Sequence, residues 1–160
     1  MKHTIGIADM KVSSAPGDTL ITYALGSCLG ITAYDPVAKV GGMIHIMLPN
    51  SAVSPEKAKN NPLMFVDTGV PELFRTCYKA GAKKERIVLK VAGGASTQNN
   101  PDEDQFQIGK RNFLMLRKLL WKNNVLIKSW DVGETYSRTM ALELETGRVT
   151  LKINNQETEL

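Results

Sequence analysis

Apolar and polar residues alternate along much of this chain with a period of two, the pattern of β-strands. The alternation is clearest at Thr139–Glu145, where Met140, Leu142 and Leu144 fall on one face. Strands are expected at Met10–Ser13, Thr19–Leu25, Leu29–Tyr34, Val40–Leu48, Arg86–Ala92, Val125–Val132, Thr139–Glu145 and Arg148–Ile153. The largely polar end of the chain, Asn154–Leu160, is expected to fray.

Two segments instead show the three- and four-residue apolar spacing of a helix. The first lies within Asn61–Ala80 and stops before Gly81, and the second is Ile108–Trp121. The polar segments Ser54–Asn61 and Thr97–Gln105 are expected to be loops. Because the strands far outnumber the helices, we predict an α/β fold with mixed or mainly antiparallel sheets and the two helices packed on one side.

The composition is that of a soluble globular protein. A length of 160 residues fits one domain, residues 1–160, with 42% hydrophobic and 22% charged residues. Aromatic residues are scarce at 6%, and no nucleic-acid reader motif is visible, so nucleic acid is not an expected partner. With two cysteines, no signal peptide and no stretch of roughly 18 apolar residues, we expect a cytoplasmic protein that does not insert into the membrane.

The two cysteines lie in different settings. Cys77 falls on the apolar face of the first helix, where a free cysteine acts as a small buried hydrophobe. Cys28 lies between Gly26-Ser27 and Gly30, and glycines there permit a sharp turn and close approach by another molecule. A thiol at such a turn suits an acyl-transfer nucleophile beside an oxyanion hole, and a purely structural turn is the alternative.

His45 lies inside the apolar run Val40–Leu48, whereas His3 lies in the N-terminal segment. A buried histidine needs a hydrogen bond, so a satisfied core residue is one interpretation of His45. The strand after Cys28 and the strand of His45 are consecutive, however, and antiparallel pairing would bring the two residues opposite each other. A thiolate–imidazolium pair would then lower the pKa of the thiol.

A catalytic imidazole needs a third group that orients the ring. Thr22 lies six residues before Cys28, and its hydroxyl could accept a hydrogen bond from His45. Asp18 and Asp35 are charged alternatives, and residue chemistry alone does not choose among the three.

Two segments, Ile21–Gly30 and Gly41–Pro49, resemble the signature of CheD, the chemoreceptor glutamine deamidase family. The histidine of the second segment follows the cysteine of the first by seventeen residues. The resemblance continues in order through Val91–Ala95, Ile108–Asn112, Asp131–Gly133 and Thr146–Val149. It departs at Glu134–Arg138, where the family often has further glycines, so the shape of this edge is left open.

This resemblance implies that Cys28 is the nucleophile, His45 the base and Thr22 the third member. The oxyanion and substrate-binding site is expected to involve Gly26, Ser27 and Gly30. The resemblance also implies an α/β sandwich related to deamidating bacterial toxins. The implied reaction converts specific receptor glutamines to glutamate and releases ammonia, with no metal and no organic cofactor. The implied partners are the cytoplasmic helices of chemoreceptors and the CheC phosphatase.

Other interpretations of the same residues stay open. One is a non-catalytic module that binds CheC or receptors, and another is a cysteine peptidase or transglutaminase. Gly93–Ser96 lacks the spacing and lysine of a phosphate loop, so a tight turn beside the active site is expected. Cys28 and His45 supply too few ligands for a structural zinc site.

The formal net charge is +4, and basic residues gather in two stretches. They are Lys79, Lys83, Lys84, Arg86 and Lys90 in the first, and Lys110, Arg111, Arg117, Lys118 and Lys122 in the second. Either these are solvated helix faces, or they dock an acidic receptor helix bundle or adaptor.

Overall fold

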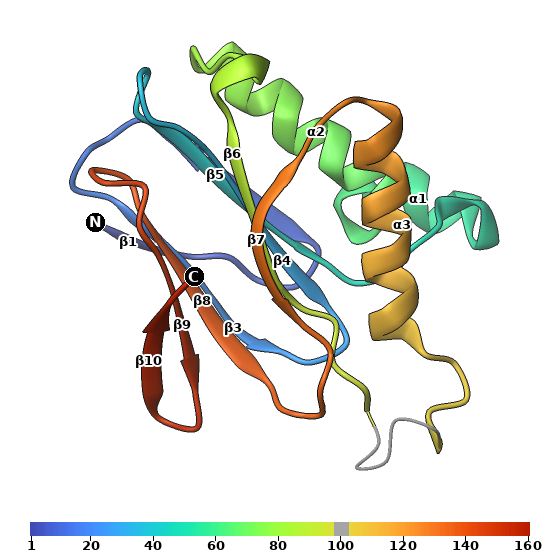
Figure 1. Ribbon diagram of the computed structural model, residues 1–160. Helices are drawn as coiled ribbons and strands as arrows, with labels where there is room; N and C mark the ends of the chain where they lie inside the picture. Colours follow the sequence, from blue (N-terminus) through green and yellow to red (C-terminus); the bar gives the residue numbers. More distant parts are fainter. Residues whose placement is uncertain (98–102) are drawn as a thin grey trace.

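Two five-stranded sheets pack face to face in the computed structural model, which describes residues 1–97 and 103–160 (Figure 1). Sheet A consists, in spatial order, of β1 (Lys2–Thr4), β3 (Thr19–Leu25), β8 (Arg138–Glu143), β9 (Val149–Ile153) and β10 (Gln156–Glu159). Sheet B consists of β2 (Asp9–Ser13), β5 (Val40–Ile46), β4 (Leu29–Asp35), β6 (Val88–Gly93) and β7 (Ile127–Val132). The β1–β3 and β6–β7 pairs are parallel and the other pairs antiparallel, which confirms the predicted mixed arrangement.

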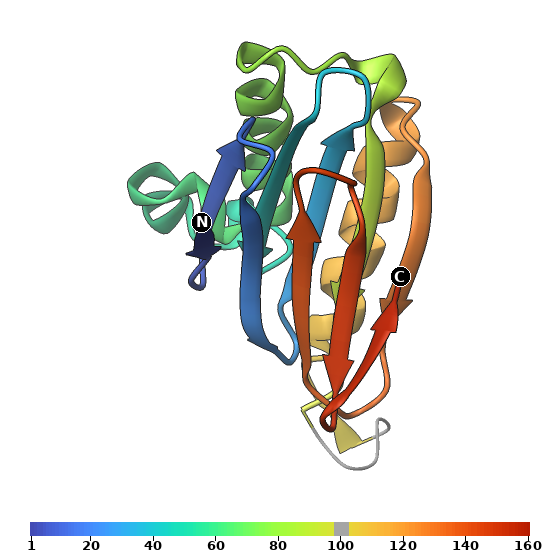
Figure 2. The ribbon, with the colours of Figure 1, turned by 90° about the vertical axis from the view of Figure 1, so that its left-hand side faces the viewer.

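The helices cover the outer face of sheet B, and sheet A covers its other face (Figure 2). The two long helices are α2 (Val66–Lys79) and α3 (Ile108–Lys122), which confirms two helices packed on one side. A third helix, α1 (Pro55–Asn60), corrects the loop expected at Ser54–Asn61. Pro55 begins it, since the fixed φ of proline suits the first turn of a helix. The loop expected at Thr97–Gln105 lies partly outside the described residues. Among those described, no helix is long and apolar enough to cross a membrane.

The central strands β4 and β5 are buried along their whole length because both of their faces are covered. On β5, Ile44 and Ile46 pack against the helices, whereas Met43 packs in the core between the sheets. His45 follows the alternation of a strand and faces sheet A, as Met43 does. The prediction that Val40–Leu48 contains a strand covered on both faces is confirmed.

In β3 the alternation of buried and exposed residues breaks just before the chain crosses from sheet A to sheet B. Thr22 is buried, Tyr23 and Ala24 are exposed, and Leu25 is buried again. The register with β8 shifts between Thr22 and Leu25, and Ala24 has a φ of +55°. This is a β-bulge, which re-aims side chains and bends the strand. The chain then enters β4 through a short loop that contains Cys28.

The C-terminal segment is not frayed, which corrects the expectation for Asn154–Leu160. Gln156–Glu159 form β10, antiparallel to β9. Lys90 Nζ donates to the Leu160 carbonyl oxygen at 2.7 Å, and the Leu160 side chain packs against the core between the sheets. The polar composition hid this strand because β10 lies at a sheet edge and all four of its residues are exposed.

Candidate active site

Cys28 and His45 project from the same face of sheet B. Gly30 pairs directly with His45 across the antiparallel β4 and β5 strands, so Cys28, two residues earlier, is a diagonal neighbour of His45. The Cys28 side chain is half-buried and packs against the core between the sheets. The antiparallel pairing predicted for these two strands is therefore confirmed, and it brings the thiol and the imidazole to one side.

Thr22 meets His45 across the space between the two sheets. Its Oγ1 lies 2.7 Å from His45 Nδ1 and donates to the Ile5 carbonyl oxygen, also at 2.7 Å. A hydroxyl has one proton, so Thr22 must accept at His45, and the ring proton lies on Nδ1. The Nε2 lone pair is then free to accept a proton. Nε2 is buried and has no hydrogen-bond partner within the described part of the chain.

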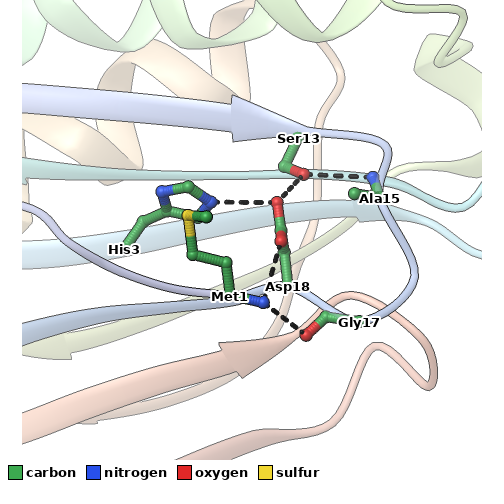
Figure 3. Close-up of polar contacts among 6 residues, drawn as sticks. All are labelled: Met1, His3, Ser13, Ala15, Gly17 and Asp18. Atoms are coloured by element: carbon green, nitrogen blue, oxygen red, sulfur yellow. Dashed lines mark hydrogen bonds and ion pairs between the residues drawn. The ribbon is translucent and has the colours of Figure 1, made fainter.

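The charged alternatives to Thr22 are engaged elsewhere. Asp18 accepts from the Ser13 hydroxyl at 2.6 Å and lies 3.0 Å from His3 Nε2 and 3.2 Å from the α-amino group of Met1 (Figure 3). The Ser13 bond is the largest of the effects that lower the pKa of Asp18 to about 2. Asp35 is fully buried and pairs with the guanidinium of Arg86, at the opposite end of the β4–β5 pair from His45. Of the three candidates, only Thr22 contacts the imidazole.

Burial shifts the pKa values of Cys28 and His45 in opposite directions, and both shifts favour the uncharged form of the side chain. Desolvation raises the pKa of the Cys28 thiol above 9.0, although the backbone N–H of Cys28 itself partly counteracts this. Desolvation also lowers the pKa of His45 below 6.5. The structure thus favours a neutral thiol beside a neutral imidazole, whereas the sequence led us to expect a lowered thiol pKa.

Two carbonyl groups of the loop around Cys28 accept hydrogen bonds that hold the loop in place. Ala95 N–H donates to the Gly26 carbonyl at 2.8 Å, and Gly94 N–H donates to the Cys28 carbonyl at 2.9 Å. In contrast, no hydrogen bond from the N–H of Ser27 or Cys28 to another residue is found within the described part of the chain. Donors of this kind are what an oxyanion requires.

Gly30 occupies a different position from Gly26 and Ser27. It lies inside β4, paired with His45 on one side and Ala92 on the other. A Cβ on Gly30 would lie 2.8 Å from Leu25 Cδ1 and 2.9 Å from Met140 Sδ. The absence of a side chain at Gly30 therefore allows the two sheets to pack closely beside the candidate site.

The Gly93–Gly94 segment forms the tight turn that was predicted beside the site. Gly93 and Gly94 have φ values of +110° and +61°, and a Cβ on Gly93 would overlap the Cys28 carbonyl oxygen. Gly109, in the first turn of α3, packs against the backbone of Gly94 and Ala95 just as closely. Glycine is needed in this turn both for its φ values and for the close approach of three segments.

Asn112 on α3 is a site-supporting residue that the sequence did not single out. Its side chain is fully buried, and Nδ2 donates to the carbonyl of Ser27 at 2.9 Å and to that of Met47 at 3.2 Å. It thereby joins the Cys28 loop to the segment that leaves the His45 strand. An Asn on a largely apolar helix face was the available signal, since a buried amide must find partners.

Two further predictions concern residues outside the Cys28–His45–Thr22 group. Cys77 is buried among the helix-side core residues, and burial raises the pKa of its thiol to about 12, which confirms a packing role. The segment that departs from the family pattern ends in Arg138, whose side chain is completely buried. Arg138 donates hydrogen bonds to Asp131 Oδ1 at 2.8 Å and to the Gly133 carbonyl at 3.0 Å, so its guanidinium holds this segment against the end of β7.

Within 1–97 and 103–160, no group of three or more His, Cys, Asp or Glu side chains is placed to hold a metal ion.

Comparison with known proteins identifies the family of this chain. A family model described as "CheD chemotactic sensory transduction" matches residues 47–153. A protein of Syntrophus aciditrophicus named "Probable chemoreceptor glutamine deamidase CheD 1" is 51% identical over 92% of this chain and 91% of its own length. A protein of Solibacter usitatus named "Probable chemoreceptor glutamine deamidase CheD" is 47% identical over 98% of this chain and 91% of its own length. The family match begins just after His45, but the second alignment spans the region of Cys28 and His45 as well. This chain belongs to the CheD family.

Proposed function

We propose that this protein deamidates glutamine side chains of chemoreceptors, with Cys28 as nucleophile, His45 as general base and Thr22 as the residue that orients the imidazole. The observation that supports this most strongly is the contact of 2.7 Å between Thr22 and His45. Because Thr22 donates its own proton to Ile5, the contact leaves Nε2 of His45 as a proton acceptor on the Cys28 side of the sheet.

The first half of the reaction forms a thioester. The thiol proton of Cys28 passes to Nε2 of His45 while the sulfur attacks the side-chain amide carbon of the substrate. The N–H groups of Ser27 and Cys28 stabilise the resulting oxyanion. His45 then returns the proton from Nε2 to the amide nitrogen, the C–N bond breaks, and ammonia leaves.

The second half releases the product. His45 takes a proton from a water molecule, whose oxygen attacks the thioester carbon. The C–S bond breaks, the proton returns to the Cys28 sulfur, and the side chain becomes glutamate. Throughout, the hydroxyl of Thr22 accepts from Nδ1–H, so the ring keeps one orientation in its neutral and protonated forms. These steps use side chains and backbone groups of the protein alone.

The substrate defines the partner and the compartment. The relatives are named for chemoreceptors. We propose the cytoplasmic helices of such receptors as the substrate of this chain, and a cytoplasmic location is part of the same proposal. A complex with the CheC phosphatase belongs to the same proposal. It rests on the family resemblance alone.

The test is mass spectrometry of a receptor cytoplasmic fragment after incubation with the protein. We expect ammonia release, together with the mass change of an amide converted to an acid at specific glutamines. Cys28→Ala should abolish both, whereas Cys77→Ala, which removes a buried thiol from the core, should retain turnover in whatever fraction folds. Turnover that persists in Cys28→Ala would refute the proposed nucleophile.

The products also separate the competing activities. A peptidase would cut the receptor fragment, and a transglutaminase would join glutamine to an amine. A purely regulatory module would bind the fragment and leave every glutamine unchanged. Either of the first two products, or tight binding without turnover, would overturn the deamidase proposal.

A further inference from the structure

Four large apolar side chains are exposed together on the outer side of α3 and β7. Leu114 and Trp121 belong to α3, Leu126 to the following loop and Trp130 to β7, and all four line one hollow. Trp121 is 81% exposed and Leu126 is 88% exposed. We call these four residues the Trp surface. Single exposed apolar residues are ordinary, but a contiguous set of this size marks an interaction site.

The hollow beside the Trp surface has a volume of about 480 Å³. Phe113, Leu120 and Ile127 also line it. Helix α3 lies beside β7, the edge strand of sheet B (Figure 1). The Phe113 ring lies 6.5 Å from the Trp130 ring, and the Arg117 guanidinium lies 5.9 Å from the centre of the Phe113 ring. These contacts position the side chains before any partner arrives, which reduces the entropy lost on binding.

Basic side chains surround the Trp surface. Arg117 and Lys118 line the hollow, Lys122 lies next to Trp121, and Lys128 lies on β7. Helix α3 contains no acidic residue, and the one on β7 is bonded to the buried guanidinium of Arg138. A second copy of this chain would bring like charges together, whereas an acidic partner would be complementary.

The hollow continues toward the candidate active site. A second hollow of about 360 Å³ lies along the first turns of α3 and shares Phe113 and Leu114 with the first. Asp104 and Glu134 line this second hollow, so the basic rim belongs to the first hollow alone. Gly94 and Gly109 line it, and Gly94 N–H holds the Cys28 carbonyl. From Gly109 to Trp121, α3 extends about 18 Å, the length of about twelve residues of a partner helix. The Cys28 side chain packs against the core between the sheets, whereas α3 packs on the outer face of sheet B, so a helix lying here would dock the substrate and not itself supply the glutamine.

We propose that the Trp surface, with Arg117, Lys118 and Lys122, is an exosite for an acidic amphipathic helix of the chemoreceptor. Apolar side chains of that helix, at three- and four-residue spacing, fill the hollow, and its carboxylates pair with the basic rim. The exosite rests on the proposed function, because its occupant is the substrate protein. It adds a docking contact at a distance from the reacting amide.

The test compares kinetics on a folded receptor fragment with kinetics on a short unstructured glutamine peptide. Trp121→Ala/Leu126→Ala should raise KM for the fragment about tenfold and leave the peptide kinetics unchanged, since aromatic anchors dominate binding. Lys118→Glu/Lys122→Glu should raise KM for the fragment and weaken its salt dependence. The matched controls are Val37→Ala/Val53→Ala, which alters exposed apolar residues elsewhere, and Lys57→Glu/Lys59→Glu on α1. Both controls should keep the original KM.

An unchanged KM for the fragment in Trp121→Ala/Leu126→Ala would overturn the exosite while leaving deamidation intact. If the unmodified protein releases no ammonia, the proposed function fails and calorimetric binding of the fragment decides about the exosite. Binding about tenfold weaker in this variant than in the valine control would support the exosite. Equal binding would overturn it.

Discussion

Thr22 reaches His45 from the opposite sheet, with 2.7 Å between Oγ1 and Nδ1. Thr22 belongs to sheet A and His45 to sheet B, so their hydrogen bond joins the two layers of the sandwich. Both side chains are buried, and the bulge that follows Thr22 lets the chain turn at once toward Cys28. The bond therefore ties the orientation of the imidazole to the packing of the whole fold.

Thr22→Val should impair the reaction because it removes the acceptor of the Nδ1 proton and frees the ring to change tautomer. We expect kcat/KM to fall about 10²-fold, the lower range for loss of acid–base catalysis. The unpaired ring N–H should also lower the free energy of unfolding by about 1–3 kcal/mol. Ammonia release and urea unfolding measure the two effects. Thr22→Ser keeps the hydroxyl and should retain most of the activity and most of the stability. An equal loss of activity in Thr22→Val and Thr22→Ser would contradict the orienting role.

The raised pKa of Cys28 predicts slow alkylation at neutral pH. The thiolate is the reactive form, so the rate of modification by iodoacetamide should rise with pH and reach half of its maximum above pH 9.0. Mass spectrometry of the modified peptide follows the rate, and Cys28→Ala identifies the residue. A rate already at its maximum at neutral pH would show a preformed thiolate–imidazolium pair and contradict the neutral resting state.

The lowered pKa of His45 predicts a loss of stability in acid. Below pH 6.5 the unfolded chain binds a proton at this residue before the folded chain does, so the unfolded state is favoured as the pH falls. This contribution to stability is complete above pH 6.5 and is lost as the pH falls through the lower pKa of the folded state. Urea unfolding at a series of pH values gives the free energy of unfolding as a function of pH. The contribution of His45 is the difference in this pH dependence between the unmodified protein and His45→Gln. An identical pH dependence in the two proteins would contradict the prediction.

Asn112→Ala should separate the Cys28 loop from the end of the His45 strand. Two partly buried carbonyls, those of Ser27 and Met47, lose their donor, which should lower the free energy of unfolding by about 1 kcal/mol. Because the loop then relaxes, kcat should fall more than KM rises. Asn123→Ala is the control, since Asn123 lies at the end of the same helix and donates to one exposed carbonyl. Equal effects of the two variants on kcat and on the free energy of unfolding would show that Asn112 does not support the site.

Arg138→Met should destabilise the fold. It leaves the partly exposed carboxylate of Asp131 and the Gly133 carbonyl without their donor, and the loss of such hydrogen bonds costs about 1–3 kcal/mol. Arg148→Met provides the comparison, since Arg148 pairs with Glu143 and Glu159 at the surface and such pairs contribute less than about 1 kcal/mol. Thermal or urea unfolding of the two variants measures the difference. Similar losses would mean that the buried guanidinium has no special structural role.

Much of the fold could be predicted from local patterns. The apolar run of β5, the alternation of β8 and the three- and four-residue spacing of α3 each lie within one element, and each was confirmed. The segments that were missed carry weak local signals. Strand β10 is exposed along its whole length, and α1 buries none of its residues. The main partners of both elements are close in sequence, β9 for β10 and the flanking turns for α1, so the lack of an apolar pattern is what hid them. Strand β1, of three residues, was also missed.

The sequence by itself determined that β4 and β5 pair, because consecutive strands joined by a short turn pair in antiparallel order and an alternation of two fixes which residues share a face. In this pairing Gly30 lies opposite His45, and Cys28 precedes Gly30 by two residues. Residue chemistry did not choose between Thr22, Asp18 and Asp35, although the family resemblance implied Thr22, and it did not reveal the contacts of Asn112. Those contacts are made between the two sheets and between a helix and two loops. Only the tertiary structure decided them, because the distance between separate layers depends on how all of their side chains pack together.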